Sequence, residues 1–352
     1  MAWVANHKKL TMLLAGITVA ALAALVVLIV FYQKPTQNPD VSRTAPLKPE
    51  APAEKFYSPL TGVELPDEAA SKRPITAVVI ENSPSARPQS GMQQAEVVYE
   101  SIAEAGITRF VNLYQQNKPG LLGPVRSLRP YLVDWIKPWD ASIAHVGGSK
   151  RALDEVRNGS YRDLDQMLDA SAYWRSSDRY APHNVYTNFE QLDAANTSKN
   201  YANSTPKPLA HTDTQKAEQP GATQITVNMS SHLYNSAWSY HAESNMYHRQ
   251  QGGAPHVDRE EGQITSRSVV ILSSHMDHIM EDGWRENYHT VGTGDGVVFQ
   301  DGTVTEVTWH KPAAGEQHFF THKTSGEPFE LARGKVWISA IPANDGGSVS
   351  WQ

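Results

Sequence analysis

Two arginines, Arg126 and Arg129, lie three residues apart in the stretch GPVRSLRPY, between a Gly-Pro turn and a proline that suits the first position of a helix. A planar guanidinium group binds phosphate or carboxylate through two parallel hydrogen bonds. Two such groups beside a helix start are able to converge on one oxyanion. The pair therefore indicates an anion-binding site, although pairing with Asp or Glu in a structural network explains the same residues.

A second stretch, AHVGGSK, supports the anion site. It predicts a strand, two glycines that allow close backbone approach, and a helix N-terminus where an anion is favoured and where Ser149 adds a hydroxyl. His145 and His183 are suitable hydrogen-bond donors or general bases. Glu81 and Asn82 end an expected strand and join the same edge if the sheet is open. The alternative interpretation is a tight strand-to-helix turn with two structural histidines.

The C-terminal half contains two further polar groupings. The first, in MYHRQQGGAPHVD, is a second candidate polar cluster and comprises Arg249, His256 and Asp258. The second, in SSHMDHIMEDGW, offers His275, Asp277 and His278, whose side chains are suitable ligands for zinc or manganese. No HExxH or comparable ligand spacing is present, and both histidines follow an expected strand into a loop. We therefore expect no metal site and no cofactor.

Composition excludes several classes of protein. The chain has 352 residues and a net charge of -6, which argues against general nucleic-acid binding because that needs a basic face. It contains no cysteine, which excludes a disulfide framework, a thiol nucleophile and an iron-sulfur cluster. Neither a GxSxG elbow nor a P-loop is present.

The N-terminal region predicts a membrane anchor. Residues 11–32 are uncharged and apolar, long enough to cross a hydrocarbon core of roughly 30 Å, and are followed by bulky residues rather than a cleavage site. Lys8 and Lys9 favour a cytoplasmic position for residues 1–10. Residues 33–56 are rich in proline and alanine and predict a linker. The expected location is therefore a single-pass signal-anchor in the cell membrane, with the bulk of the chain extracytoplasmic.

Residues 57–199 predict an α/β domain with a mixed sheet. A buried strand is expected over 75–82, and two strands are expected over 96–115 with a turn at Ala105-Gly106. The expected helix starts are Pro130 at a first helical position, Ser149 as an N-cap, and Thr187 with Glu190 as a capping box.

Residues 200–221 are polar and turn-rich and predict a second linker, so the domain boundary is placed there. Residues 222–352 predict a mostly-β domain that closes into a barrel or sandwich. Within it, Asp301-Gly302 predicts a hairpin between two alternating runs. Each part has a size that suits an independent domain, so two separate hydrophobic cores are expected.

Several motifs follow one another in a specific order: IENSPSARPQSG, AEVVYE, ITRFVNLY, GPVRSLRPY, AHVGGS, PHNVYT and then MYHRQQGGAPHVD. In this order the chain resembles the YerB-like family of bacterial envelope lipoproteins, a domain of unknown function with N- and C-terminal parts. The resemblance spans nearly everything after Phe56 and implies an envelope location and a two-part architecture. Family members are commonly attached to lipid through a cysteine, and this chain has none. The apolar helix would then replace the lipid.

These observations favour a membrane-anchored protein that binds an anionic envelope ligand, such as a glycan, or a protein partner, and that binds no nucleic acid. The alternative is an envelope phosphotransferase or hydrolase acting on phosphate-linked glycans. That alternative needs a metal or a base beside the arginines. A weaker resemblance to the LytR-CpsA-Psr phosphotransferases, which also run strand, turn, strand and then arginines, supports it.

Overall fold

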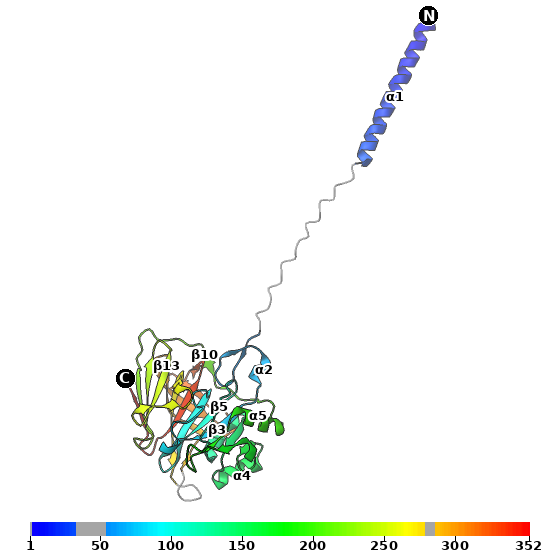
Figure 1. Ribbon diagram of the computed structural model, residues 1–352. Helices are drawn as coiled ribbons and strands as arrows, with labels where there is room; N and C mark the ends of the chain where they lie inside the picture. Colours follow the sequence, from blue (N-terminus) through cyan, green and yellow to red (C-terminus); the bar gives the residue numbers. More distant parts are fainter. Residues whose placement is uncertain (1, 33–53, 279–285) are drawn as a thin grey trace. The chain divides into compact units, whose positions relative to one another are not determined.

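The computed structural model describes residues 2–32, 54–278 and 286–352 and divides the chain into two compact units, Met1–Glu54 and Lys55–Gln352 (Figure 1). The first unit contains the helix α1 (Ala2–Tyr32), whose described apolar side chains, such as Ile17 and Phe31, are exposed. In the described ranges, no helix has both the length and the apolar character that a membrane span requires. Residues 33–53 of the expected linker lie outside the described residues.

A mixed sheet forms the centre of the second unit. In the described part of the chain it has 11 strands, in the order β24-β23-β22-β21-β18-β26-β4-β5-β3-β6-β7. The pairs β18–β26, β26–β4, β3–β6 and β6–β7 are parallel and the other pairs are antiparallel. In chain order the bounds are β3 (Thr76–Glu81), β4 (Val97–Glu104), β5 (Ile107–Tyr114), β6 (Ser142–His145), β7 (Arg162–Asp165), β18 (Ser268–Ser274), β21 (Gly292–Gln300), β22 (Thr303–Lys311), β23 (Phe319–His322), β24 (Pro328–Phe329) and β26 (Val336–Pro342).

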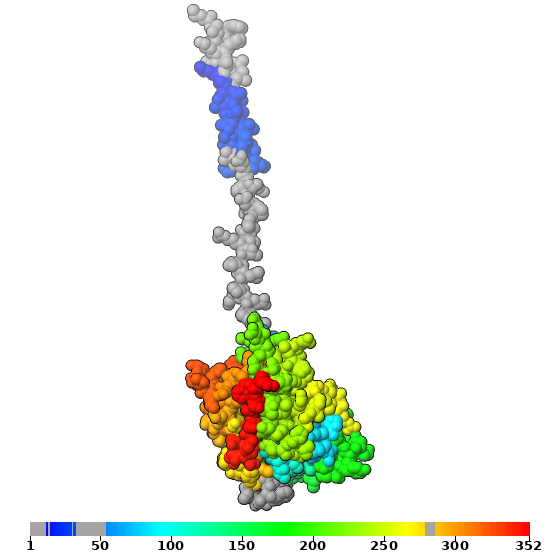
Figure 2. Space-filling model, turned by 90° about the vertical axis from the view of Figure 1, so that its left-hand side faces the viewer, coloured from blue at the N-terminus to red at the C-terminus, as the bar shows by residue number. Residues whose placement is uncertain are grey.

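A second sheet has the order β14-β13-β12-β11-β27, with β17 paired to β13. Its strands are β11 (Gln224–Asn228), β12 (Ser236–His241), β13 (Met246–Gln251), β14 (Ala254–Pro255), β17 (Thr265–Ser266) and β27 (Ser348–Trp351). The last strand, red in Figure 2, lies beside the yellow-green residues of this sheet, in agreement with its pairing to β11.

Short ribbons and helices complete the unit. The ribbons are β1–β2 (Phe56–Tyr57, Glu64–Leu65), β8–β9 (Trp174–Arg175, Val185–Tyr186), β10–β25 (His211–Thr212, Leu331–Ala332), β15–β16 (Val257–Asp258, Gly262–Gln263) and β19–β20 (Met276–Asp277, Asn287–Tyr288). The helices are α2 (Glu68–Ser71), α3 (Pro130–Ile136), α4 (Lys150–Asn158) and α5 (Phe189–Ser198), with 3-10 turns η1 (Pro84–Ala86), η2 (Lys137–Trp139) and η3 (Ala170–Ala172). Helices α4 and α5 lie toward the β3 side of the unit and β13 lies on the opposite side (Figure 1).

Local sequence signals account for several of these elements. Strands β4 and β5 turn at Ala105-Gly106, where both residues have positive φ, as the sequence predicts. The Asp301-Gly302 hairpin is confirmed with the same backbone conformation, between β21 and β22. Ser149 caps α4 by accepting a hydrogen bond from the Ala152 amide.

The predicted capping box at Thr187 and Glu190 is wrong by one residue. Helix α5 begins after Asn188, whose side chain accepts a hydrogen bond from the Gln191 amide. The Thr187 hydroxyl instead donates to the Ala172 carbonyl at 2.7 Å. Asn is as good an N-cap as Ser or Thr, and tertiary contact decides between the two adjacent candidates.

The mixed sheet expected before residue 200 is confirmed, but the expectation of two separate cores is wrong. Strand β26 from the C-terminal part pairs in parallel with β4 from the N-terminal part, from Val336↔Val97 to Ser339↔Glu100. The Trp337 ring lies 5.4 Å from Phe110 and 5.3 Å from Trp238, so one hydrophobic core crosses the join. The long C-terminal strands extend the N-terminal sheet instead of closing on themselves.

This continuity predicts that residues 55–221 and 222–352 do not fold as separate fragments. Cutting between them exposes the edge of β4 and the apolar surface around Trp337, which neither fragment can cover alone. We expect each fragment alone to lack near-UV circular dichroism and a cooperative thermal transition, and co-expression to restore both. A sharp transition in either isolated fragment would contradict the shared core.

Candidate functional site

The second candidate polar cluster is a buried network rather than an open site. Arg249 on β13 has no solvent exposure and makes two hydrogen bonds to Glu100 on β4, at 2.8 and 2.9 Å. Its guanidinium carbon also lies 4.6 Å from the Trp337 ring centroid. Its Nε has no partner among the described residues, but the whole side chain is buried and its charge is paired with Glu100, so an external anion does not reach it.

His256 continues this network toward the N-terminal part. Arg249 donates to His256 Nδ1, so Nε2 carries the proton and donates to Gln89 Oε1 at 3.0 Å. Burial, and then the charges of Arg249, Arg87 and Lys335, hold the pKa of His256 well below its usual value.

Asp258 ties a turn of the chain instead of facing a ligand. Its carboxylate accepts hydrogen bonds from the backbone amides of Gln93, Glu260 and Glu261, at 3.0 to 3.1 Å. Asp258 is only 1% exposed, so its carboxylate binds these backbone amides and is not accessible to a ligand from solvent.

Arg129 also belongs to a buried ion network. Its guanidinium group is paired with Glu104, which also pairs with Arg109 at 2.9 Å. Arg129 is 3% exposed and donates to the Leu128 carbonyl as well. The structure therefore places Arg129 in the structural network that was the alternative interpretation of the pair.

Glu104 carries a strongly perturbed carboxyl group. Burial acts to raise its pKa, but the charges and hydrogen bonds of Arg109 and Arg129 outweigh burial and lower the pKa to about 2. The carboxylate is therefore ionised at neutral pH and stabilises the folded chain.

His145 and Ser149 have structural partners. His145 is fully buried, with Nε2 2.9 Å from Asp163 Oδ1 and Nδ1 2.8 Å from the Gly147 carbonyl oxygen. The amide of Gly147, the first of the two glycines in AHVGGSK, donates to Asp165 at 2.9 Å and so does not face an external anion. The backbones of residues 126–129 and 146–149 are adjacent, as expected, but the arginine side chains do not converge on this turn.

Arg126, Glu81 and His183 come together as the sequence predicts. Glu81 ends β3 and is buried, with Arg126 Nε 3.3 Å from Oε2 and His183 Nδ1 2.8 Å from Oε1. Ser83 also donates to Glu81 Oε1, at 2.9 Å. Glu81 therefore fixes the orientation of the His183 ring and leaves Nε2 as the nitrogen that is directed away from the carboxylate.

Asn82, the remaining predicted residue, binds Arg87, which was not among the predicted site residues. It is fully buried; its Nδ2 donates to Thr108, and its Oδ1 accepts from Gln89 at 3.0 Å and from Arg87 at 3.1 Å. Asn82 is thus joined to the buried network on one side and to Arg87 on the other.

A cavity of about 600 Å³ opens beside His183 and is rich in arginine. We name it the arginine cavity, and its principal lining residues are Arg87, Arg179, Arg259, Asp178, Tyr180 and His183. Arg259 pairs with Asp178 at 2.6 Å. The other two arginines have different partners.

Arg87 and Arg179 are held by uncharged oxygens. Arg87 donates to the carbonyls of Asn82 and Leu233, both at 2.9 Å. Arg179 donates to the carbonyls of Ser85 at 2.8 Å and Pro88 at 2.6 Å. Within the described residues, no carboxylate lies within 4.0 Å of either guanidinium group. Their direction is fixed but their charge is not neutralised.

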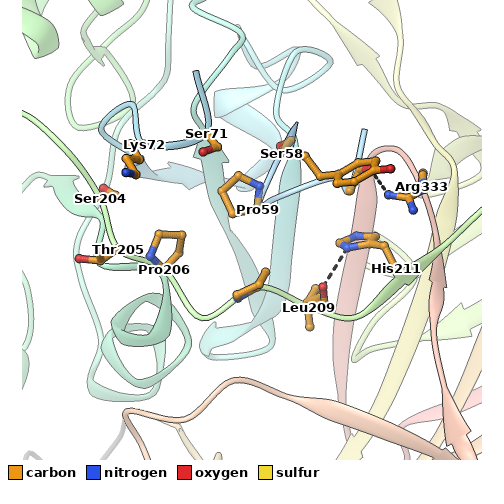
Figure 3. A pocket seen from close by; sticks show the side chains of 13 residues that line it. Ser58, Pro59, Ser71, Lys72, Ser204, Thr205, Pro206, Leu209, His211 and Arg333 are labelled. Carbon is orange, nitrogen blue, oxygen red and sulfur yellow. Dashed lines mark hydrogen bonds between the residues drawn. The ribbon is translucent and has the colours of Figure 1, made fainter. Parts of the chain in front are cut away.

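A second cavity of about 470 Å³ lies at the segment that was expected to be a linker, and Figure 3 shows its lining side chains. Lys72, Ser204 and Thr205 lie at one end of the cavity, and His211 and Arg333 lie at the other. Pro59 and Pro206 lie between them (Figure 3). His211 Nδ1 lies 2.9 Å from the Leu209 carbonyl oxygen, and burial lowers the pKa of His211 to about 4. This histidine is therefore neutral at pH 7 and does not make the cavity cationic.

The arginine cavity has no local signature in the sequence because its arginines come from three distant segments. Arg87 and Arg179 each lie close in sequence to a residue that was selected, Glu81 or His183, but Arg259 lies in the C-terminal part. The one local feature that the two segments share is a proline near the arginine, directly after it in Arg87-Pro88 and three residues after it in RYAPH. Nothing in the sequence distinguishes these arginines from those that pair with carboxylates.

Comparisons with known proteins place the chain in a family. Residues 60–202 match the family described as "Protein of unknown function (DUF3048) N-terminal domain", and residues 225–338 match its C-terminal domain. The "Putative lipoprotein YerB" of Bacillus subtilis (strain 168) is 29% identical over 337 residues, which are 95% of this chain and 97% of that protein. The crystal structure of the YerB protein from Bacillus subtilis has a TM-score of 0.74 at 29% identity and covers 84% of this chain and 100% of that chain.

The Glu104 network predicts an acid-dependent loss of stability. Because the folded pKa of about 2 lies below the ordinary glutamate pKa of 4.5, the stabilisation is fully present above pH 4.5 and is lost as the pH falls toward 2. The shift corresponds to about 3 kcal/mol. In Glu104→Gln the two arginines lose their partner, so the free energy of unfolding at pH 7 should fall by about 3 to 5 kcal/mol.

The measurement is chemical denaturation of wild type and Glu104→Gln from pH 7 to pH 2. The difference between them should shrink as the pH falls below 4.5. Glu64→Gln serves as control, because Glu64 pairs with Lys55 on the surface and such pairs contribute little. A difference that stays constant over the whole range would contradict the assignment.

Proposed function

The chain belongs to the DUF3048 family, and from that premise we propose that it is an envelope protein that binds an anionic ligand in the arginine cavity. One observation carries the proposal: Arg87 and Arg179 have fixed guanidinium groups whose charges are not neutralised by any described carboxylate. A phosphate or carboxylate group would supply the missing negative charge.

The energetics of these arginines favour an anion over water alone. Hydrogen bonds to carbonyls orient each guanidinium group before a ligand arrives, so little side-chain entropy is lost on binding. Arg87 is partly buried, so its positive charge is incompletely solvated, and this burial lowers its pKa. An anion in the cavity would relieve that cost through charge-assisted hydrogen bonds.

The rim of the cavity suits a ligand with a sugar or other flat, partly apolar group. Tyr180 lines the cavity and is 92% exposed, so its ring has little contact with the rest of the protein. Exposed tyrosines of this kind are typical of binding surfaces, because the ring packs on apolar faces while the hydroxyl stays in water. Tyr180 beside two charged arginines therefore supports a phosphorylated or carboxylated glycan as the ligand class.

An envelope location is part of the same proposal. The Bacillus subtilis relative is described as a lipoprotein, and this chain has no cysteine through which a lipid could be attached. The apolar residues 11–32 supply a different means of attachment, as a single-pass anchor with the second unit outside the cytoplasm. Exposed apolar side chains on α1, such as Phe31 at 83%, are consistent with a lipid environment.

The second candidate function is a phosphotransferase or hydrolase that acts on phosphate-linked glycans. The observation that favours it is the Glu81–His183 pair, in which a buried carboxylate orients an imidazole at the wall of the arginine cavity. An imidazole held in this way can accept a proton from an attacking hydroxyl or water. Ser83 is not positioned as its nucleophile, because both Ser83 and Glu81 contact the same ring nitrogen, Nδ1.

The anion proposal predicts that Arg179→Lys binds a fluorescent glycerol-phosphate oligomer about tenfold more weakly than wild type, because lysine keeps the charge but loses the planar fork. Fluorescence anisotropy measures the affinity, which should also weaken as salt is raised. Arg73→Lys is the control, since Arg73 is an exposed arginine with a neutral partner, Gln116.

Two results would contradict the proposal: an unchanged affinity in Arg179→Lys, and equal losses in Arg179→Lys and Arg73→Lys. Thermal melts of each variant separate lost binding from lost fold. His183→Ala distinguishes the two functions, because binding alone should survive this change, whereas turnover of a phosphodiester substrate should not.

The location proposal predicts that protease added to intact cells removes residues 55–352 from the membrane fraction. Deleting residues 11–32 should release the chain from membranes that have been washed with carbonate. Protection of the second unit until the cells are lysed would show the opposite orientation, and release by carbonate without the deletion would show that the helix is no anchor.

A further inference from the structure

Three metal-ligating side chains converge on the β19–β20 ribbon, on the side of the C-terminal part where the sequence predicts no metal. They are His275, Asp277 and His289. His275 Nε2 lies 3.3 Å from Asp277 Oδ1, and His289 Nε2 lies 2.9 Å from Asp277 Oδ2. The three ligand atoms all lie within 4.8 Å of one another. We propose that these three side chains form a binding site for a divalent transition-metal ion, with zinc as its representative.

The ribbon explains why these residues meet. Met276 pairs with Tyr288, so the flanking His275 and His289 face each other across the two strands, and the His289 amide donates to the His275 carbonyl at 2.9 Å. Side chains alternate between the two faces of a strand. Met276 and Tyr288 are buried, which puts the three ligands together on the outer face.

Side-chain hydrogen bonds from Asn344 and Ser274 fix the backbone of the site. Asn344 accepts from the Met276 amide and donates to the Met276 carbonyl, both at 2.8 Å. Ser274 donates to the His289 carbonyl at 2.6 Å. The two histidines and the carboxylate are therefore presented by a fixed piece of backbone, as a metal site requires.

The distances fit a small tetrahedral ion. Zinc binds imidazole nitrogen and carboxylate oxygen at about 2.0 to 2.2 Å, which separates neighbouring ligand atoms by roughly 3.3 Å in a tetrahedron. His275 Nε2 lies 3.3 Å from Asp277 Oδ1 and His289 Nε2 lies 2.9 Å from Oδ2, so each imidazole is near that separation from a different carboxylate oxygen. A small rotation of the carboxylate would bring one oxygen to both nitrogens. Two imidazoles and one carboxylate are also a donor set that suits transition ions better than magnesium, which prefers oxygen.

Hydrogen bonds alone would also bring two imidazoles to one carboxylate, so the site needs a test of its own. The side chains are 47 to 54% exposed, which leaves room for one or more water molecules on the ion. Three protein ligands with open positions are the arrangement found in sites that exchange water or bind a further ligand. This site is separate from the arginine cavity, and its failure would leave the anion proposal untouched.

The experiment titrates the intact, metal-free chain with zinc and measures binding by calorimetry. The change in Tm is measured in parallel, and the absorption spectrum of the cobalt-bound chain reports the coordination geometry. We expect one ion per chain, a higher Tm with zinc, and no comparable response to magnesium. Asp277→Asn and His289→Ala should each weaken zinc binding by about 10- to 100-fold or more, since even second-shell partners of metal ligands contribute that much.

His278→Ala is the matched control. His278 is a neighbouring, exposed histidine that lies 3.5 Å from Asp345 and is outside the cluster, so its removal should change the affinity less than about twofold. Absence of zinc binding, half an ion per chain, or equal losses in His278→Ala and His289→Ala would each overturn the proposal. The metal-free variants should have the same Tm as the metal-free wild type, because the changed side chains are exposed. Thermal melts therefore separate a loss of zinc binding from misfolding.

Discussion

The second unit depends on one ion pair that water does not reach, between Glu100 of β4 and Arg249 of β13. Removing two charges from water costs several kcal/mol for each ion, and the pair offsets this cost only if its geometry is good and further hydrogen bonds satisfy the charged groups. Glu100 meets this condition by also accepting from Trp337 Nε1 at 3.0 Å and Ser339 Oγ at 3.1 Å, both on β26. The carboxylate thus joins two strands of the large sheet to the second sheet. Replacing either partner in the folded unit would leave the other as a buried, uncompensated charge.

The same network determines the geometry of the arginine cavity. From Arg249 the hydrogen bonds continue through His256 and Gln89 to Asn82, which accepts from Arg87. Arginine can only donate, so His256 Nδ1 must accept from Arg249 and Nε2 must donate to Gln89 Oε1. The Gln89 amide nitrogen then donates to Asn82 Oδ1. The direction of the Arg87 guanidinium group is therefore set by contacts that begin in the C-terminal part of the chain. The orientation of an arginine at the surface cavity thus depends on hydrogen bonds within the buried network.

Local sequence signals predicted the structure where one short segment decides it. The turn at Gly106, the hairpin at Gly302 and the cap at Ser149 depend on residues within about four positions of each other, and all three are present. The partner of Arg129 was not predictable in this way. Glu104 lies 25 residues earlier, at the end of β4, and meets Arg129 at the start of α3 only through the tertiary structure. The common core was missed for the same reason, because strand pairing across the two parts has no local signature.

The partner of each arginine decides what it can do, and partners are properties of the fold. Arg126 and Arg129 looked alike in sequence to Arg87 and Arg179, yet the first two meet carboxylates and the last two meet carbonyls. A carboxylate orients a guanidinium group and cancels its charge, whereas a carbonyl orients it and leaves the charge. The net charge of -6 does not oppose an anion in the cavity strongly, because salt screens charges beyond about 8 to 10 Å. Within that distance, the residues that line the cavity include three arginines and one carboxylate, Asp178, which is paired with Arg259.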